Sequence, residues 1–341
     1  DILEFSKIEA GNFDLDLDLK AFSLENLLSQ LRAIFYQVEN YKNIELYFYN
    51  KSGNPKIVLS DELRILQVLT NFISNALKFT NKGNITLKIE LLEKTSANSA
   101  KIRFSVQDTG IGISEDDIPN LFKPFFQVDN SATRKYGGTG LGLSISERIV
   151  NSLGSTIEVQ SQKDVGTEFS FTINMEVLEW SKENLLNSKK FKILIVDDQE
   201  ISRIILKDML ESFGYIFFEA KDGVEAISMI KEADISNEPF DFVLMDFNMP
   251  RLNGKDAIKQ IYELHKKNII KNTIPSILMV SAYSKEEIGL EDILIDNFIS
   301  KPITNSTLFD ALANIKKGIA RKSNDIESSK DCPNLFGIKV L

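Results

Sequence analysis

This sequence lacks an excess of basic residues and long apolar runs, and it has very little cysteine. Its 40 lysines and arginines are outnumbered by 49 aspartates and glutamates, and the formal net charge of −9 gives no support for a nucleic-acid partner or for binding to an anionic membrane. The single cysteine, Cys332, excludes an intrachain disulfide and fits a reducing compartment. No apolar run approaches the roughly 18 residues that a membrane-spanning helix needs. We therefore expect a cytoplasmic segment, whose membrane attachment, if the full-length protein has one, lies outside it.

Histidine is equally scarce, since His265 is the only one in the chain. It lies in the sequence Glu-Leu-His-Lys-Lys, and no candidate catalytic residue is spaced to it. A lone histidine in a charged, helix-like segment is more often a solvent-exposed side chain than a catalytic group. We interpret His265 as a surface residue.

A length of 341 residues predicts about two domains, and a polar stretch at residues 179–190 divides the chain. Before this stretch, two segments have the apolar periodicity of helices and four alternate like strands with one solvated face. The helical segments are residues 22–39 and 62–79, and the strand-like segments are residues 44–49, 85–91, 102–107 and 168–173. The first domain is therefore predicted to be an α/β sandwich, a mixed sheet under helices.

The pattern changes after residue 190. Short continuous apolar runs now alternate with segments of helix length, and strands buried on both faces have this pattern. The runs are residues 192–196, 242–245, 276–280 and 297–299. We expect a doubly wound, parallel sheet.

Polar residues that suit a nucleotide gather on the segment 62–79. Asn71, Asn75 and Lys78 share the face opposite its apolar stripe. An amide oxygen is a hard ligand suited to Mg²⁺, and a lysine can meet phosphate as a point charge. On their own, such residues are more often a solvated helix face.

Three further motifs, two of them rich in glycine, follow in order and favour a nucleotide site over a solvated helix face. Residues 108–112 read Asp-Thr-Gly-Ile-Gly after a strand, where Asp108 can accept from an exocyclic amine, and Gly110 and Gly112 let backbone approach a flat ring. Residues 122–126 read Phe-Lys-Pro-Phe-Phe. A glycine-rich loop then opens a helix, which makes a phosphate cradle with Arg134 and Lys135 just before it. That loop consists of Gly138, Thr139, Gly140, Leu141, Gly142 and Leu143.

These four motifs resemble the catalytic, ATP-binding domain of histidine kinases, over residues 21–177. The resemblance implies that Asn75 holds the Mg²⁺ of ATP, that Asp108 reads adenine, that Lys78 and the loop 138–143 contact phosphates, and that Thr167 belongs to a last, weaker motif. Gyrase-like and chaperone ATPases share the fold, but they use a glutamate at the position of Asn71 to activate water. Because Asn71 cannot take a proton at neutral pH, transfer to a protein is favoured over hydrolysis.

Five polar residues follow successive strands in the second half. They are Asp197, Asp198, Asp246, Ser281 and Lys301. Ligands bind beyond the carboxyl ends of strands in a parallel α/β sheet, so all five are expected at one edge. Three carboxylates repel unless a divalent cation binds them, and Mg²⁺ with a lysine and a hydroxyl is what a phosphoryl group needs. A single aspartate at a strand end would more often be a helix cap.

Residues 191–318 resemble the receiver domain of response regulators, a flavodoxin-like fold with five parallel strands. The resemblance implies that Asp246 accepts the phosphoryl group, and that Ser281 and Lys301 contact its oxygens. It also implies that Asp198, Asp246 and the carbonyl of Asn248 hold Mg²⁺, with Asp197 acting mainly through water.

Together these resemblances indicate part of a hybrid sensor histidine kinase in a two-component phosphorelay. Residues 1–20 resemble the end of a dimerisation helix, so the phosphoacceptor histidine and a sensor are expected upstream of Asp1, and the full-length protein is expected to be a homodimer. A phosphotransfer protein is the alternative partner. Residues 337–341 resemble residues 190–194, which suggests a second receiver domain, with a frayed tail as the alternative. We place linkers at residues 178–190 and 319–336.

Two functions stay open at this point. The first is an enzyme that transfers phosphate from ATP to a histidine and then to Asp246. The second is a non-catalytic switch, in which Asp246 accepts phosphate from a partner and the nucleotide-binding domain is vestigial.

Overall fold

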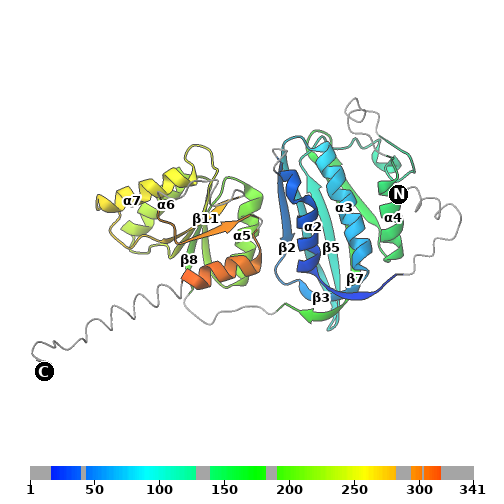
Figure 1. Cartoon of the computed structure of the whole chain (residues 1–341), viewed down its shortest axis with the longest axis horizontal. Coiled ribbons are helices and arrows are strands. Elements are labelled where there is room, and N and C mark those ends of the chain that lie inside the picture. The colour runs from blue at the N-terminus through cyan, green and yellow to red at the C-terminus, as the bar shows by residue number, and fades with distance from the viewer. Residues whose placement is uncertain are drawn as a thin grey trace, which may run out of the picture. The chain divides into compact units, whose positions relative to one another are not determined.

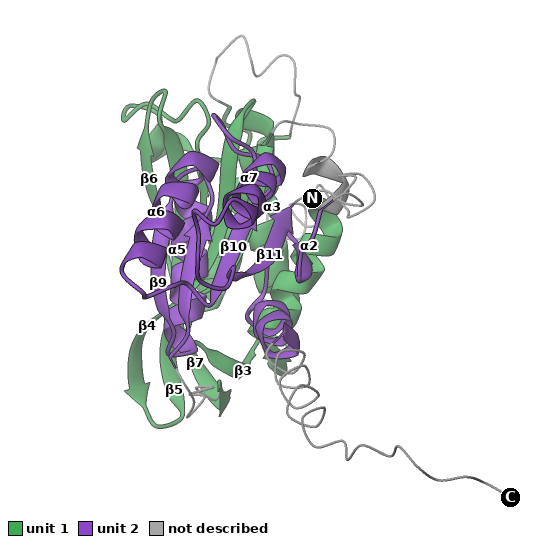
Figure 2. Ribbon diagram, turned by 90° about the vertical axis from the view of Figure 1, so that its left-hand side faces the viewer, with its two compact units in different colours: residues 1–183 green, residues 184–341 purple. Residues whose placement is uncertain are grey.

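The computed structural model describes residues 17–39, 44–127, 139–181, 190–281, 293–301 and 303–315. It divides the chain into two compact units, which are Asp1–Glu183 (unit 1) and Asn184–Leu341 (unit 2; Figure 2). Among the described residues, no helix is both long and apolar enough to cross a membrane.

Unit 1 is a curled seven-stranded sheet with helices on one face (Figure 1). The strand order is β1-β3-β7-β5-β4-β2, and β6 pairs with β7. The sheet is mixed because β2 and β4 are parallel, whereas the other pairs are antiparallel. Its strands are β1 (Lys20–Ser23), β2 (Ile44–Asn50), β3 (Pro55–Ser60), β4 (Gly83–Ser96), β5 (Ser99–Asp108), β6 (Ile157–Gln162) and β7 (Gly166–Trp180).

Alternation along the strands explains why the helices cover only one face. Ile102, Phe104 and Val106 on β5 are buried, whereas Lys101 and Gln107, which flank them, are exposed. The buried side chains pack in one core with the helices of unit 1. These are α2 (Leu24–Glu39), α3 (Glu62–Phe79) and α4 (Gly142–Ser152), with a short 3-10 helix at Ile118–Asn120.

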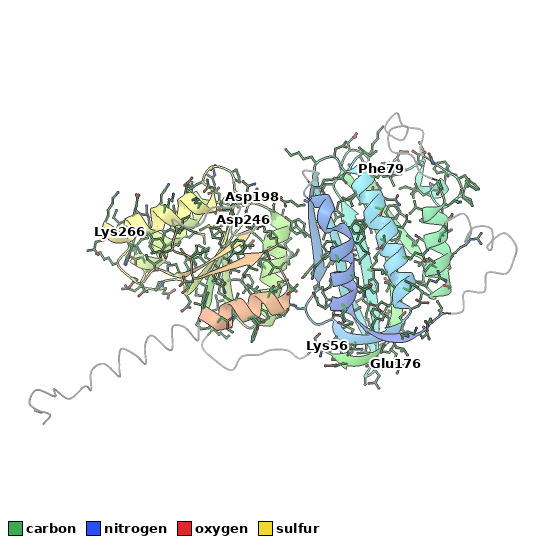
Figure 3. All side chains as sticks on the ribbon, viewed as in Figure 1. Lys56, Phe79, Glu176, Asp198, Asp246 and Lys266 are labelled. Carbon is green, nitrogen blue, oxygen red and sulfur yellow. The ribbon has the colours of Figure 1, made fainter. Side chains whose placement is uncertain are left out.

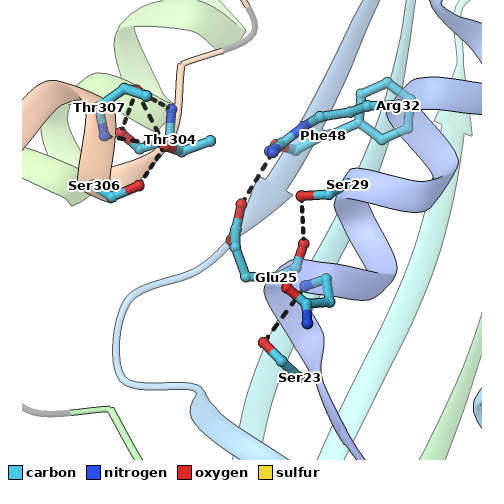
Figure 4. A network of polar contacts seen from close by, with 9 residues as sticks. Ser23, Glu25, Ser29, Arg32, Phe48, Thr304, Ser306 and Thr307 are labelled. Atoms are coloured by element: carbon cyan, nitrogen blue, oxygen red, sulfur yellow. Dashed lines mark hydrogen bonds and ion pairs between the residues drawn. The ribbon is translucent and has the colours of Figure 1, made fainter.

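Polar contacts fasten helix α2 to the sheet. Arg32 donates from Nη1 to Glu25 Oε1 at 3.0 Å and from Nη2 to the carbonyl of Phe48 on β2 at 3.0 Å (Figure 4).

A threonine caps the last described helix of unit 2. The Thr304 hydroxyl accepts from the backbone N–H of Thr307 at 3.1 Å. That bond caps the helical residues 305–315.

Unit 2 is a five-stranded, fully parallel sheet in the order β12-β11-β10-β8-β9. Helices α6 and α7 share a core with one face of it. Helix α5 and residues 305–315 lie on the other face (Figure 1). There the ring centroids of Phe213 and Phe309 are 5.5 Å apart. The elements are β8 (Lys192–Val196), α5 (Glu200–Ser212), β9 (Ile216–Ala220), α6 (Gly223–Ile235), β10 (Phe242–Asp246), α7 (Gly254–Lys266), β11 (Ser276–Ser281) and β12 (Asn297–Ser300).

The predicted fold class is confirmed for both halves of the chain, a mixed sheet under helices followed by a five-stranded parallel sheet. Four strands have no counterpart among the segments predicted above. They are β1, β3, β6 and β9, which are four to six residues long. Strands this short give too few positions for periodicity to separate a strand from a loop.

Candidate functional sites

Helix α3 carries the residues predicted to bind a nucleotide, and they lie on the part of the helix away from its buried stripe. Asn71, Asn75 and Lys78 are each half-buried. The Lys78 Nζ atom lies 5.0 Å from the centre of the neighbouring Phe79 ring. Asn71 is engaged within the protein, since its Nδ2 donates to the Ser146 hydroxyl on α4 at 2.9 Å.

Asp108 ends strand β5 and is 8% exposed. Its Oδ1 accepts from the backbone N–H of Gly110 at 2.8 Å, and it pairs across the β5–β7 ladder with Thr167. Burial raises the pKa of Asp108, and backbone hydrogen bonds from Gly110 and Thr167 oppose that rise. A buried carboxyl group with one oxygen held by a backbone N–H can accept a hydrogen bond from a single donor of the ligand on its other oxygen.

The glycines after Asp108 have a reason that sequence reasoning did not supply. A Cβ atom on Gly110 would lie 2.6 Å from the carbonyl oxygen of Phe79, and one on Gly112 would lie 2.0 Å from that of Gln162. Gly112 also has φ +64°, a left-handed conformation. These two glycines therefore also let the protein's own backbone approach closely, which packs this turn onto the ends of α3 and β6. Their predicted contact with a flat ring stays a prediction.

The glycine-rich loop enters the N-terminus of helix α4. Gly140 has φ +70°, and its carbonyl accepts from the N–H of Phe125 at 3.1 Å. Thr139 accepts from the N–H of Leu141 at 3.4 Å, and Leu141 is buried in the core that Leu143 also contacts. Among the described residues, no side-chain hydrogen bond caps the N-terminus of α4, and a helix N-terminus of this kind can bind an anion through its first N–H groups. Arg134, Lys135 and Gly138 lie outside the described residues.

At one edge of the sheet in unit 2, the structure brings together the acidic residues that follow β8 and end β10 (Figure 3). One carboxylate oxygen from each of Asp197, Asp198 and Asp246 lies within 4.8 Å of the others. Ser281 at the end of β11 is 2% exposed, and its carbonyl accepts from the N–H of Lys301 at 2.7 Å. The five predicted polar residues therefore lie at the ends of the strands β8, β10, β11 and β12, along one edge of the sheet.

Lys301 bridges two of the carboxylates. Its Nζ lies 2.7 Å from Asp246 Oδ1 and 2.9 Å from Asp197 Oδ2. Burial raises the pKa of Asp246 to about 6, and the Asp197 charge adds to the rise, while Lys301 and the N–H of Asn248, at 3.0 Å, oppose it. Burial disfavours the charged form of Lys301, but the two carboxylates outweigh it and raise the pKa of the lysine.

The donor set at this edge fits a Mg²⁺ ion. Carboxylate and carbonyl oxygens are the ligands that this ion prefers. The carboxyl group of Asp246 is held in a buried place where its charge is disfavoured, and a cation is what would reverse that. Asp198 is half-exposed and accepts from Gln199 Nε2 at 3.0 Å. Asn248 lies in the loop between β10 and α7 and is exposed.

Two residues that hold Asp197 were missed by sequence reasoning. The Ser202 hydroxyl donates to Asp197 Oδ2 at 2.5 Å, and Arg203 Nη1 donates to the Asp197 carbonyl at 2.8 Å. The Asp197 carboxylate accepts three hydrogen bonds in all, because the N–H of Gln199 donates to Oδ1 at 2.9 Å and Lys301 donates to Oδ2 beside Ser202. Ser202 and Arg203 both lie in the first turn of α5, directly after the aspartate pair. Their closeness in sequence to Asp197 is the signal that could have predicted these contacts.

Comparison with known proteins assigns a family to each unit. Residues 60–177 match the family described as histidine kinase-, DNA gyrase B-, and HSP90-like ATPase. Residues 193–313 match the response regulator receiver domain. The two matches follow one another in the order of the two units.

Individual relatives align with much of the chain. The autoinducer 2 sensor kinase/phosphatase LuxQ of Vibrio cholerae is 31% identical over 95% of this chain and 37% of LuxQ. The sensor histidine kinase GacS of Pseudomonas protegens is 38% identical over 63% of this chain and 23% of GacS. The crystal structure of full-length ShkA in complex with AMPPNP aligns with a TM-score of 0.45 at 20% identity, over 92% of this chain and 88% of ShkA. The chain thus spans well under half the length of these curated relatives.

Proposed function

We infer that unit 1 binds ATP for phosphoryl transfer and that Asp246 in unit 2 accepts a phosphoryl group. The chain belongs to the hybrid sensor histidine kinases and carries their ATPase and receiver domains in that order. The role of Asp246 as phosphoryl acceptor is supported most by the position of Lys301. Its Nζ lies 2.7 Å from Asp246 Oδ1, in a cluster of three carboxylates.

In unit 1 the nucleotide would lie against residues of α3, β5 and α4. Asn75 would hold the Mg²⁺ of ATP, Lys78 and the N–H groups at the start of α4 would contact phosphates, and Asp108 would accept from the amine of adenine. Their half-buried positions on α3 and the absence of a capping side chain on α4 among the described residues support this. Arg134, Lys135 and Gly138 are proposed for the same role from the sequence alone.

In unit 2 a carboxylate oxygen of Asp246 would attack the phosphorus of a phosphohistidine. The new P–O bond forms as the P–N bond breaks, and the electron pair stays on the imidazole, which takes up a proton. Lys301 and the Ser281 hydroxyl would contact the phosphoryl oxygens, and the charge of Lys301 stabilises the negative charge there. A bound Mg²⁺, held by Asp198, Asp246 and the carbonyl of Asn248, would supply further charge neutralisation, with Asp197 outside its direct ligands.

The phosphohistidine must come from another part of the protein or from another protein. We propose a histidine on a dimerisation domain joined to residue 1 in a homodimeric full-length protein, or alternatively a phosphotransfer protein. The enzyme name that fits is histidine kinase, with this chain supplying the ATP-binding and receiver parts.

Two measurements test the proposal. Acetyl phosphate with Mg²⁺ should label the chain, and Asp246→Asn should abolish the labelling; labelling of the variant at the wild-type level would refute the assignment of Asp246. Calorimetric titration with ATP and Mg²⁺ should show binding that Asn75→Ala removes while acetyl phosphate labelling persists. Labelling without any ATP binding would favour the alternative, a phosphate-accepting switch with a vestigial nucleotide domain.

A further inference from the structure

Helices α3 and α4 of unit 1 are joined by one polar contact between distant parts of the sequence. Asn71 Nδ2 on α3 donates to the hydroxyl of Ser146 on α4 at 2.9 Å, across 75 residues of chain. Ser146 is 2% exposed, so water does not compete well for its hydroxyl. The contact therefore fixes one point of α4 relative to one point of α3.

The same amide group also packs against the first residue of α4. A Cβ atom on Gly142 would lie 2.5 Å from Asn71 Oδ1, 3.1 Å from its Cγ and 3.2 Å from its Nδ2. Gly142 and Ser146 are four residues apart, so they lie on the same face of the helix. Asn71 thus contacts α4 at two successive turns, and only glycine at position 142 lets it approach so closely.

These two helices carry the phosphate-contacting groups of the proposed site. Asn75 and Lys78 lie one and two turns beyond Asn71 on α3, whereas the N–H groups proposed to contact phosphates belong to the start of α4. A triphosphate that contacts both helices binds well only if their separation is right. Asp108, which would contact the base, is held by a different contact, the hydrogen bond from the N–H of Gly110.

We propose that Asn71 and Ser146 form a positioning pair, which sets the distance between α3 and the N-terminus of α4 and so determines affinity for the phosphates of the nucleotide. The proposal rests on ATP binding by unit 1. It changes the role that the sequence suggested for Asn71, from a group that contacts the nucleotide to one that acts through Ser146 and Gly142. The pair should affect binding of the triphosphate and leave binding of the nucleoside unchanged.

Ser146→Ala is the direct test, and Ser144→Ala is its matched control. Both serines are buried in the same helix, but the Ser144 hydroxyl donates to the carbonyl of Leu141 at 2.8 Å, within its own turn. Loss of one net hydrogen bond predicts that Ser146→Ala weakens ATP binding about three- to tenfold. Adenosine binding should stay at the wild-type level in both variants, and Ser144→Ala should bind ATP as the wild type does. Thermal melting of each variant checks that unit 1 is folded.

A double-mutant cycle separates a positioning role from direct contact. If Asn71 acts through Ser146, then Asn71→Ala in the Ser146→Ala background should weaken ATP binding less than it does in the wild type. Additive effects would mean that Asn71 contacts the nucleotide itself, and equal ATP affinities of Ser146→Ala and Ser144→Ala would likewise overturn the pair. If the wild-type chain fails to bind ATP, the proposed function falls together with this inference.

Discussion

The Nζ atom of Lys301 lies 2.7 Å from Oδ1 of Asp246, although their strands are not neighbours in the sheet. Strand β11 separates β10, which ends at Asp246, from β12, which Lys301 follows. The two side chains meet only because parallel strands end at the same edge and a long lysine can reach across one strand. This contact joins the acceptor of the proposed reaction to its stabilising charge.

Asp246→Asn should stabilise unit 2 at neutral pH. Burial raises the pKa of Asp246 to about 6, above the ordinary value for aspartate, so the folded state binds the proton more tightly than the unfolded state. Stability is therefore highest below the ordinary pKa and falls as pH rises through about 6. The variant lacks this loss and should be more stable by on the order of 1–2 kcal/mol at pH 7.5. Denaturant unfolding without Mg²⁺ at pH 4.5 and 7.5 measures it, and a pH-independent difference would contradict the stated cause.

Lys301→Met should destabilise unit 2 and abolish labelling of Asp246. The substitution leaves Asp197 and Asp246 without the cation that lies between them, and removal of one partner from a buried ion pair costs about 3–5 kcal/mol. Adding Asp246→Asn should recover part of that loss, because one of the two stranded charges is then gone. Unfolding midpoints of the single and double variants test this, and a double variant no more stable than Lys301→Met would contradict it.

Ser202→Ala should slow acetyl phosphate labelling a few-fold with little loss of stability. Its hydroxyl donates to Asp197 Oδ2 at 2.5 Å, on the same oxygen that Lys301 contacts, so its removal frees that carboxylate to turn. Ser212→Ala is the matched control, because that hydroxyl donates to the carbonyl of Met209 at 2.7 Å at the other end of α5. The rates of labelling at several Mg²⁺ concentrations are the measurement, and equal rates for the two variants would exclude a role for Ser202.

Gly112→Ala should destabilise unit 1 far more than Gly154→Ala. Both glycines have positive φ, +64° and +76°, so both substitutions carry the penalty of about 1–2 kcal/mol for a left-handed alanine. Only at Gly112 would the new Cβ meet an atom, the carbonyl oxygen of Gln162 at 2.0 Å, whereas nothing lies within 4 Å at Gly154. Thermal melting of the two variants compares them directly. Similar melting temperatures would mean that the turn after Asp108 yields easily.

Local pattern was enough for the elements that have a strong period. The apolar repeat of residues 62–79 predicts a helix, and α3 spans Glu62–Phe79. Continuous apolar runs predicted four strands of unit 2, and the residues after them were expected at one edge because parallel strands share an edge. Edge and short strands such as β1 and β9 escaped, since pairing with a neighbour rather than an apolar period defines them.

The sequence by itself determined which chemical groups this protein has and the order of its two domains, because motif residues and strand ends are local properties of the chain. Only the tertiary structure decided what those groups contact. Asn71 looks like a nucleotide ligand in the sequence, yet its amide meets Ser146, 75 residues away. Gly112 belongs to a predicted ring-binding turn in the sequence, and the structure adds that the carbonyl of Gln162 lies where a side chain at this position would be. Contacts between distant elements depend on how helices and strands pack, and no local pattern encodes that packing.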